Sequence, residues 1–197
     1  MKFLSRNQWI IDPFVEFLSS LPENVEKGRK GCTIFCLNLE TGIPEIKQYG
    51  NDAPERRLLT ARYAPEKVLR IIEKDEQRSI FSAKEEKKKF GGGVKSSSFA
   101  IAPSGWPWKQ DEVLGVFLIG IHAVQRDITN SSLLSVDSFL KELFPYVKDF
   151  YDTCISGSTY PNEEFQKILP RFFDVGFSSF SSVKLKEQKE QWSSFSS

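Results

Sequence analysis

The sequence predicts an α+β fold built on an antiparallel sheet. Three apolar stretches are typical of buried strands, and they lie at residues 32–39, 99–102 and 113–122. Three others carry apolar residues at helical spacing, at residues 10–21, 65–72 and 132–155. The 197 residues suffice to bury one domain core, because a chain of this size hides roughly 70% of the surface that it exposes when unfolded.

The first expected helix begins at Asp12 and Pro13, because a proline in the first turn gives up an N–H that has no partner there. Pro22 ends this helix. A β-hairpin follows, in which residues 38–42 have the composition of a turn. The polar alternation of residues 45–50 is typical of an edge strand.

The pattern then predicts a second helix that begins at Pro65 and a short strand at residues 79–83. The buried stripe of this helix is expected to be Val68, Leu69 and Ile72. Residues 84–98 combine mixed charges with the triplet Gly91 to Gly93. They are expected to form a mobile loop or lid.

The second half is expected to hold the strands at residues 99–102 and 113–122, joined by a hairpin loop, and then a long helix that Pro145 kinks. Beyond Gly157 the composition shifts toward serine and phenylalanine. We therefore expect one domain at residues 1–156 and an extension at residues 157–197 that is disordered alone or docked on a partner. Its Phe-rich C-terminal stretch carries Phe172, Phe173, Phe177, Phe180, Trp192 and Phe195.

Two stretches resemble the GAF family of small-molecule sensor domains. CTIFCLNLETGIPEIKQYG is similar to the opening hairpin of that family, and residues 99–103, 112–119 and 131–151 are similar to its closing half. The resemblance covers residues 5–156. It implies an antiparallel sheet with the N- and C-terminal helices on one face and loops or short helices over a ligand on the other. It also implies a homodimer through the terminal helices, at residues 14–21 and 133–151.

The chemistry of particular GAF subfamilies does not carry over. The chain lacks a Cys-His pair that would anchor a bilin, the signature residues of the cyclic-nucleotide subfamily, and the cysteine set of the free methionine sulfoxide reductases. No cofactor is therefore expected. In a P-loop, a lysine directly follows the last glycine and a helix comes next. Here Val94 separates the triplet Gly91 to Gly93 from Lys95, and a strand follows, so nucleotide hydrolysis is not expected.

Net charge, the length of the apolar runs and the cysteine count indicate which partners and which compartment to expect. There are 27 Lys and Arg residues against 26 Asp and Glu, a net charge of +1, which does not favour nucleic acid or a membrane surface as partner. The longest apolar run, residues 113–121, is far shorter than the roughly 20 residues of a membrane span. An odd number of cysteines does not make a closed disulfide framework. The sequence thus predicts a soluble cytoplasmic protein.

The sequence offers no catalytic constellation and no metal site. His122 is the only histidine, and a general base or metal ligand needs partners close by. Cys32 and Cys36 have a spacing that two zinc ligands can have, but the sequence offers no second pair of ligands. We therefore expect both cysteines to be buried and structural. Cys154 is expected to fill the apolar stripe of the last helix. These observations predict a protein that is not an enzyme.

Trp106-Pro107-Trp108 is the most informative motif. Two indoles beside a stiff proline either fold back over the sheet as packing or line a binding pocket. With the flanking strands, the predicted ligand- or partner-binding residues are Trp106, Trp108, Phe99, Ile101, Phe117 and His122. The hypothesis is a non-enzymatic, GAF-like regulatory domain that binds a small ligand or a protein. The alternative is an adaptor without a ligand, which docks on another protein through its aromatic C-terminal arm.

Overall fold

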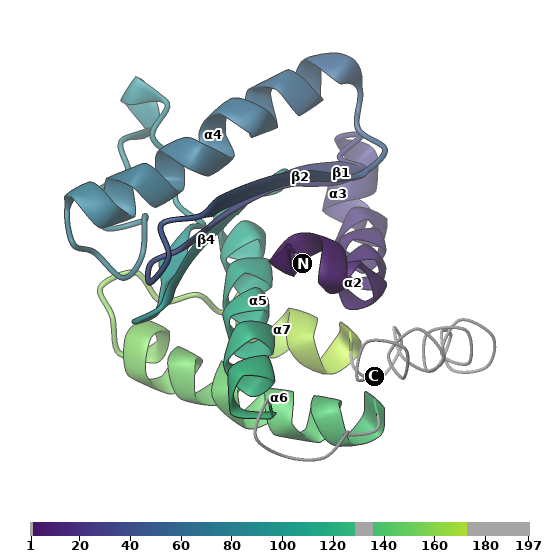
Figure 1. The fold of residues 1–197 in the computed structure, drawn as a ribbon. Helices are drawn as coiled ribbons and strands as arrows, with labels where there is room; N and C mark the ends of the chain where they lie inside the picture. The colour runs from purple at the N-terminus through teal and green to yellow at the C-terminus, as the bar shows by residue number, and fades with distance from the viewer. Residues whose placement is uncertain (1, 129–135, 173–197) are drawn as a thin grey trace.

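The computed structural model describes residues 2–128 and 136–172, in an α+β arrangement of helices around one antiparallel sheet (Figure 1). The strands are β1 (Gly31–Asn38), β2 (Pro44–Gly50), β3 (Val94–Lys95) and β4 (Phe99–Ser104). They pair antiparallel in the order β2-β1-β4-β3. The expected α+β class, the hairpin and the strand at residues 99–102 are confirmed.

The two faces of the sheet pack against different helices. On β1, Cys32, Ile34 and Cys36 join the main core, while Phe35 and Leu37 pack with Val68 in a smaller cluster on the other face. The helix α4 (Pro54–Glu73) covers this second face, and α2 (Gln8–Ser20) and α5 (Trp108–Ile128) cover the first (Figure 1). Both cysteines are buried, as the alternation of the strand predicted.

The N-terminal segment holds three consecutive helices: α1 (Phe3–Arg6), α2, and α3 (Pro22–Glu26). The start predicted at Asp12 and Pro13 is wrong, because α2 begins four residues earlier and Pro13 lies buried inside it. Burial of the apolar side of α2 against the core outweighs the hydrogen bond that an interior proline gives up. Pro22 does end α2, and it provides the first residue of α3.

The helix α4 is also longer than predicted. It begins at Pro54, in the first turn where proline is favourable, and continues through Pro65 to Glu73. Val68 is buried as expected, but Leu69 and Ile72 are exposed. The prediction placed the stripe wrongly because the inward face is partly polar, with Lys67 and Arg70 buried in it.

The largest correction concerns residues 113–122, which are not a central strand. They belong to α5, and every residue from Asp111 to Ile121 is buried. An all-round apolar helix lacks the polar face that would reveal its period, so a short apolar run does not distinguish it from a buried strand. Gly120 permits close packing on the next helix, since a Cβ there would come within 2.8 Å of Leu143 and Val147 side chains.

The segment between α4 and β4 also differs from the prediction. Residues 79–83 form turns and not a strand, and Arg78 makes an isolated bridge to Val94. A short 3₁₀ helix, η1 (Glu85–Lys87), precedes β3. Gly91 to Gly93 are buried under neighbouring side chains, which contradicts a solvent-exposed lid at the triplet.

The last elements are α6 (Val136–Tyr151), the π-helical turn η2 (Asp152–Ser156) and α7 (Glu164–Arg171). The expected long helix is confirmed over the described residues, with Pro145 inside it; Leu133 lies outside them. Cys154 is half-buried against the core. Phe144 is exposed and thus does not belong to the buried stripe.

The predicted extension begins inside the main core. Phe165, Ile168, Leu169 and Phe172 are buried in the same cluster as α2 and α5. A boundary at residue 156 therefore does not separate two units of packing. Phe173 and the later aromatic residues of the arm lie outside the described residues.

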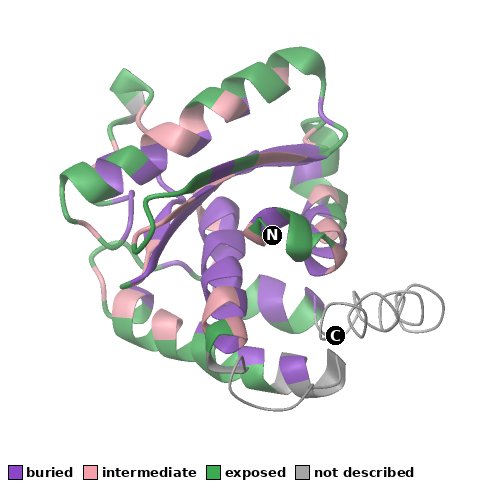
Figure 2. Cartoon of the chain, viewed as in Figure 1, coloured by how far each residue is buried: buried purple, intermediate pink, exposed green. Residues whose placement is uncertain are grey.

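The core occupies the space between the sheet, α2, α5 and α7 (Figure 2). The stripes suggested for dimerisation through the terminal helices lie in this core, because Phe14, Leu18, Leu143 and Val147 are buried within the chain. None of the helices in residues 2–128 and 136–172 combines the length and apolar character that a membrane span requires.

Candidate ligand-binding site

The turn between β4 and α5 carries the two tryptophans that were predicted to bind a ligand or partner. The chain turns through Gly105, where a Cβ would lie 2.4 Å from the Gly31 carbonyl oxygen, so no side chain fits. The N–H groups of Gln110 and Asp111 then donate to the Pro107 carbonyl and begin α5. Trp106 therefore lies before the helix, and Trp108 is its first residue. The expected hairpin loop at residues 103–111 is instead this strand-to-helix turn.

A buried ion pair holds the junction. Asp111 Oδ1 accepts hydrogen bonds from the N–H groups of Gly105 and Trp106, at 3.1 and 3.0 Å, and Oδ2 accepts one from Lys67 Nζ at 2.8 Å. Lys67 Nζ also donates to the Pro103 carbonyl at 2.8 Å. Burial raises the pKa of the Asp111 carboxyl, and the Lys67 ammonium opposes that rise. Removal of either charge leaves the other buried without a counter-ion.

Gly92 covers this pair. Its φ of +101° lies in the region that favours glycine, and a Cβ there would come within 2.6 Å of Asp111 Cβ and 3.0 Å of the Trp108 carbonyl oxygen. Gly93 likewise leaves room for Lys67, whose Cβ would lie 3.2 Å from an added Cβ. The glycine triplet is explained by this close packing.

A cavity of about 400 Å³ opens beside the ion pair. Four of its lining residues are aromatic: Tyr63, Phe90, Trp106 and Trp108. Three are cationic and one is anionic: Arg29, Arg56, Lys67 and Asp111. The volume falls within the range of roughly 300–1,000 Å³ that is typical of small-molecule sites.

Hydrogen bonds and one ion pair within the chain hold the two arginines of the cavity in place. Arg56 Nη2 donates to the Gly105 carbonyl at 2.6 Å, and its Nε lies 3.3 Å from Asp52 Oδ1. Arg29 Nη1 donates to Asn24 Oδ1 at the long distance of 3.5 Å. A guanidinium has five N–H donors, so both retain donor capacity beyond these contacts.

The aromatic walls differ in burial. Trp106 is only 6% exposed, and its indole Nε1 has no acceptor among the residues that the structure describes. Trp108 is half-buried, with Lys109 Nζ 5.6 Å from its ring centroid. On the α4 side, the rings of Tyr63 and Phe90 meet edge to face at 5.1 Å. Trp106 is thus part of the wall, while Trp108 presents a face that is not fully covered.

Of the six predicted binding residues, only Trp106 and Trp108 line this cavity. Phe99 and Ile101 point to the opposite face of the sheet, and Phe117 packs in the core against Phe14 at a centroid distance of 4.6 Å. Phe99 also lies beside a separate hollow of about 420 Å³ next to the β1–β2 turn. Phe99 and Ile101 are separated from the tryptophans by the alternation of β4, and Phe117 is separated from them because residues 113–122 form a helix.

His122 lies on α5 and is half-buried. Its ring stacks on Phe99 with centroids 4.3 Å apart and meets Phe3 edge to face at 5.8 Å. Burial lowers its pKa, Arg126 lowers it further, and Glu40 opposes both. These surroundings indicate a packing role.

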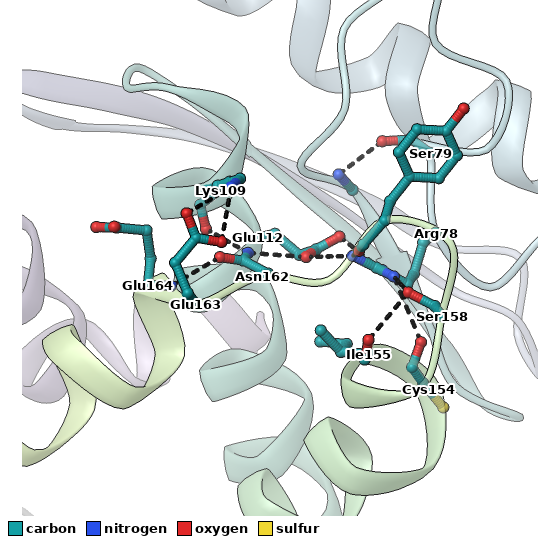
Figure 3. A network of polar contacts seen from close by, with 12 residues as sticks. Arg78, Ser79, Lys109, Glu112, Cys154, Ile155, Ser158, Asn162, Glu163 and Glu164 are labelled. Carbon is teal, nitrogen blue, oxygen red and sulfur yellow. Dashed lines mark hydrogen bonds and ion pairs between the residues drawn. The ribbon is translucent and has the colours of Figure 1, made fainter.

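A second buried ion pair lies on the other side of α5 (Figure 3). Arg78 Nε and Nη2 donate to Glu112 Oε1 and Oε2, at 2.9 and 2.8 Å, and both side chains are completely buried. Arg78 also donates to Ser158 Oγ at 2.6 Å and to the Tyr160 carbonyl at 2.8 Å. Asn162 Nδ2 donates to Glu112 Oε2 at 2.9 Å. This network ties the segment between η2 and α7 to α5.

Sequence reasoning missed both ion pairs and the arginines of the cavity. Lys67 lies 44 residues from Asp111, and Arg78 lies 34 residues from Glu112. One signal was available in the sequence. Two adjacent acidic residues, Asp111 and Glu112, precede an apolar run, as acidic residues do in the first turns of a helix. Within residues 2–128 and 136–172, no cluster of His, Cys, Asp and Glu side chains has the arrangement of a metal site.

Comparison with known proteins found no matching family model, no matching curated protein and no matching solved structure. The function is therefore argued from the geometry of the site.

Proposed function

We propose that this chain is a non-enzymatic regulatory domain, which binds a small anionic ligand with a flat unsaturated body. The ligand lies in the cavity between α4 and the β4–α5 junction. The observation that carries the proposal is the combination of four aromatic side chains and two arginines around one cavity of about 400 Å³.

The aromatic residues support a flat ligand body. Stacked and edge-to-face contacts with aromatic rings favour planar unsaturated groups, and Trp108 offers a ring that protein atoms cover only in part. The unpartnered N–H of Trp106 is a further donor at this wall, for which an acceptor atom of the ligand or a water molecule would be the partner.

The charges support an anionic group on that body. Lys67 and Asp111 neutralise each other at 2.8 Å, and Arg56 pairs with Asp52 at 3.3 Å, so the net positive charge of the lining comes from Arg29, while both guanidiniums keep N–H donors for a ligand. Guanidinium groups bind carboxylates and phosphates through paired hydrogen bonds. A carboxylate and a phosphate share this chemistry.

The ion pair in the wall favours binding over catalysis. Both Asp111 oxygens accept hydrogen bonds from the protein, and the Lys67 ammonium donates two. A general base needs a free lone pair within reach of the substrate proton, and three of the roughly four lone-pair sites of this buried carboxylate are already occupied. Here the pair holds the backbone of Trp106 and thereby fixes the cavity.

Thermal stabilisation by matched probe pairs tests this function. One pair is adenosine 5′-monophosphate and adenosine; the other is 2-naphthoate and 2-naphthamide. We expect only the anionic member of at least one pair to raise the melting temperature, since a ligand at 100 times its Kd stabilises the native state by about 2.7 kcal/mol. Equal effects of the anionic and neutral members would refute the proposed ligand chemistry.

Two substitutions place the effect in the cavity. Arg56→Gln and Trp108→Ala should each weaken binding of the effective anion by roughly tenfold or more. Arg62→Gln is the matched control, because it removes the same charge from the same helix outside the cavity. If no probe binds the wild-type chain, the adaptor function without a ligand is favoured instead.

A further inference from the structure

A groove of about 280 Å³ lies between α6 and α7, which run in opposite directions (Figure 1). Two helices that pack against each other normally fill the space between them with side chains. Here the space is open, although most of its lining is apolar, and it therefore calls for an occupant. The apolar residues that line this α6–α7 groove are Phe144, Val147, Tyr151, Phe165, Leu169 and Pro170.

Side-chain contacts join the two helices at one end of the groove. Gln166 Nε2 donates to the Tyr151 hydroxyl at 3.3 Å, and the rings of Tyr151 and Phe165 have centroids 5.1 Å apart. Phe144 and Pro170 line the opposite end, about two helical turns away along α6. Because α7 ends one residue after Pro170, the chain leaves the helix at this opposite end of the groove.

The polar residues of the lining have partners within the chain. Lys148 and Asp152, one turn apart on the rim, form an ion pair, and the Gln166 amide bonds to Tyr151. The lining therefore presents no net charge for an occupant to match. An uncharged segment with apolar side chains fits this groove best, because a charged one would lose its hydration without a counter-ion.

The sequence that follows α7 has this composition. Residues 175–183, VGFSSFSSV, contain no charged residue and carry two aromatic side chains, Phe177 and Phe180. The next residues, 184–190, are mostly charged. A cavity of about 150 Å³ holds one benzene ring, so a groove of about 280 Å³ has room for two phenyl rings.

The length of this segment also fits. The groove extends about 10 Å along the helices, whereas residues 173–180 span up to about 26 Å when extended. Gly176 permits the reversal of direction that brings the chain back along α7. A short tether gives the segment an effective concentration on the order of 1 mM at the groove, which a separate protein would have to match.

We propose that residues 173–183 occupy the α6–α7 groove of the same chain, with Phe177 and Phe180 packed between the two helices. The groove is then a docking site for an uncharged peptide segment with two aromatic anchors, and the chain supplies that segment itself. A partner protein that docks in the groove must displace the segment. Conversely, Phe177 and Phe180 can contact another protein only after the segment leaves the groove.

A fluorescently labelled synthetic peptide of residues 173–183 tests the occupant. Fluorescence anisotropy measures its binding to the full wild-type chain and to the full chain with Phe177→Ser and Phe180→Ser, which removes both anchors. With an effective concentration of about 1 mM and a peptide Kd of about 100 μM, the wild-type segment should weaken peptide binding roughly tenfold relative to this double variant. Trp192→Ser with Phe195→Ser is the matched control, because it removes two aromatic side chains beyond the segment, and it should behave as the wild type.

Three results of this titration would overturn the proposal. Equal affinity of the peptide for the wild type and for the Phe177/Phe180 variant would show that the groove is open to other proteins. Equal effects of the two double variants would show that the anchors lie elsewhere in the sequence. A peptide that does not bind the Phe177/Phe180 variant at concentrations up to about 1 mM would show that the segment does not fit the groove.

A further substitution places the peptide in the groove. In the Phe177/Phe180 variant, Phe144→Ser should weaken peptide binding by roughly tenfold, whereas Leu58→Ser, which removes an apolar side chain of α4 that is 76% exposed, should not. Circular dichroism melts check that both variants fold, and equal effects of the two substitutions would contradict the assignment. Sedimentation equilibrium should give the same mass for the wild type and the Phe177/Phe180 variant. A wild-type dimer that this variant dissociates would show that the segment occupies the groove of a second copy, which refutes docking within one chain.

Discussion

The two buried ion pairs of α5 begin at adjacent residues and serve different ends. Asp111 faces α4 and pairs with Lys67 in the wall of a cavity. Glu112 lies about 100° further around the helix and pairs with Arg78. Arg78 and Glu112 have protein partners from the 154–162 segment on the remaining donors and acceptors. One pair therefore forms part of a cavity wall, and the other fastens residues 154–162 to α5.

The two pairs differ in how many protein groups bond to their buried charges. The Arg78 guanidinium is bidentate on Glu112 and fills its other positions with Ser158 and two backbone carbonyls. Such saturation offsets the desolvation of both ions. Among the residues that the structure describes, the Lys67 ammonium bonds only to Asp111 and the Pro103 carbonyl, and it lies at a cavity wall. We infer that the first pair is specialised for anchoring and that the second combines anchoring with a binding surface.

The largest expected effect is the loss of the Arg78–Glu112 pair. Arg78→Met leaves a fully buried carboxylate without its counter-ion and should lower the free energy of unfolding by about 3–5 kcal/mol. Denaturant-induced unfolding measures the loss. The control is Lys109→Met, which removes the exposed neighbouring pair with Glu163 and should cost about 1 kcal/mol or less. Similar losses in the two variants would contradict the anchoring role.

This comparison also shows how far the sequence alone leads. The hairpin at residues 31–50 was predictable because its turn and its alternation lie within a few residues of one another. The fold of residues 113–122 was not, since a helix buried on every side and a buried strand have similar apolar composition. That error placed Phe117 and His122 beside the tryptophans, whereas Phe117 lies in the core and His122 stacks on Phe99 away from the cavity.

The candidate site was predictable only in its aromatic part. Two tryptophans around a proline stand out locally, because exposed indoles are unfavourable without a function. The charged residues of the cavity come from different segments, Arg29 after α3, Arg56 and Lys67 on α4, and Asp111 on α5. Their proximity follows from the packing of α4 across the sheet, which no local pattern specifies.

Substitution in the Lys67–Asp111 pair should lower stability less, and weaken ligand binding more, than substitution in the Arg78–Glu112 pair. Asp111→Asn keeps the shape and one acceptor for the Trp106 N–H, but it leaves the Lys67 ammonium buried without a counter-ion. The free energy of unfolding should fall by about 1.5–3 kcal/mol, the range for a hydrogen bond to a charged group. Binding of the effective anionic probe should weaken about tenfold, because the Trp106 wall is no longer fixed.

Glu112→Gln is the matched comparison for that variant. It should cost more stability than Asp111→Asn, yet any chain that remains folded should bind the probe with nearly unchanged affinity. Titration calorimetry and denaturant unfolding on both variants measure the two quantities. If the two substitutions weaken binding equally, the distinction between an anchoring pair and a cavity pair fails.

The smallest expected effect belongs to His122 of α5, which faces Phe99 and Phe3 with Arg126 and Glu40 nearby. Burial and Arg126 lower its pKa below the ordinary value of about 6.5. Between the lowered pKa and that value, the unfolded chain binds more protons than the folded one, so stability rises with pH across this window. The contribution of the neutral imidazole is complete above about pH 6.5 and is lost as the pH falls through the folded pKa.

Because the chain has one histidine, its imidazole proton resonances report this pKa directly by NMR. The His122→Phe variant, which retains a ring beside Phe99, should have a flatter dependence of unfolding free energy on pH between about 5 and 6.5. A measured pKa above 6.5, or identical pH dependence in the variant, would show that a neighbouring carboxylate outweighs burial at this position. A pKa above 6.5 would mean that His122 depends on a charge partner, as Asp111 and Glu112 do.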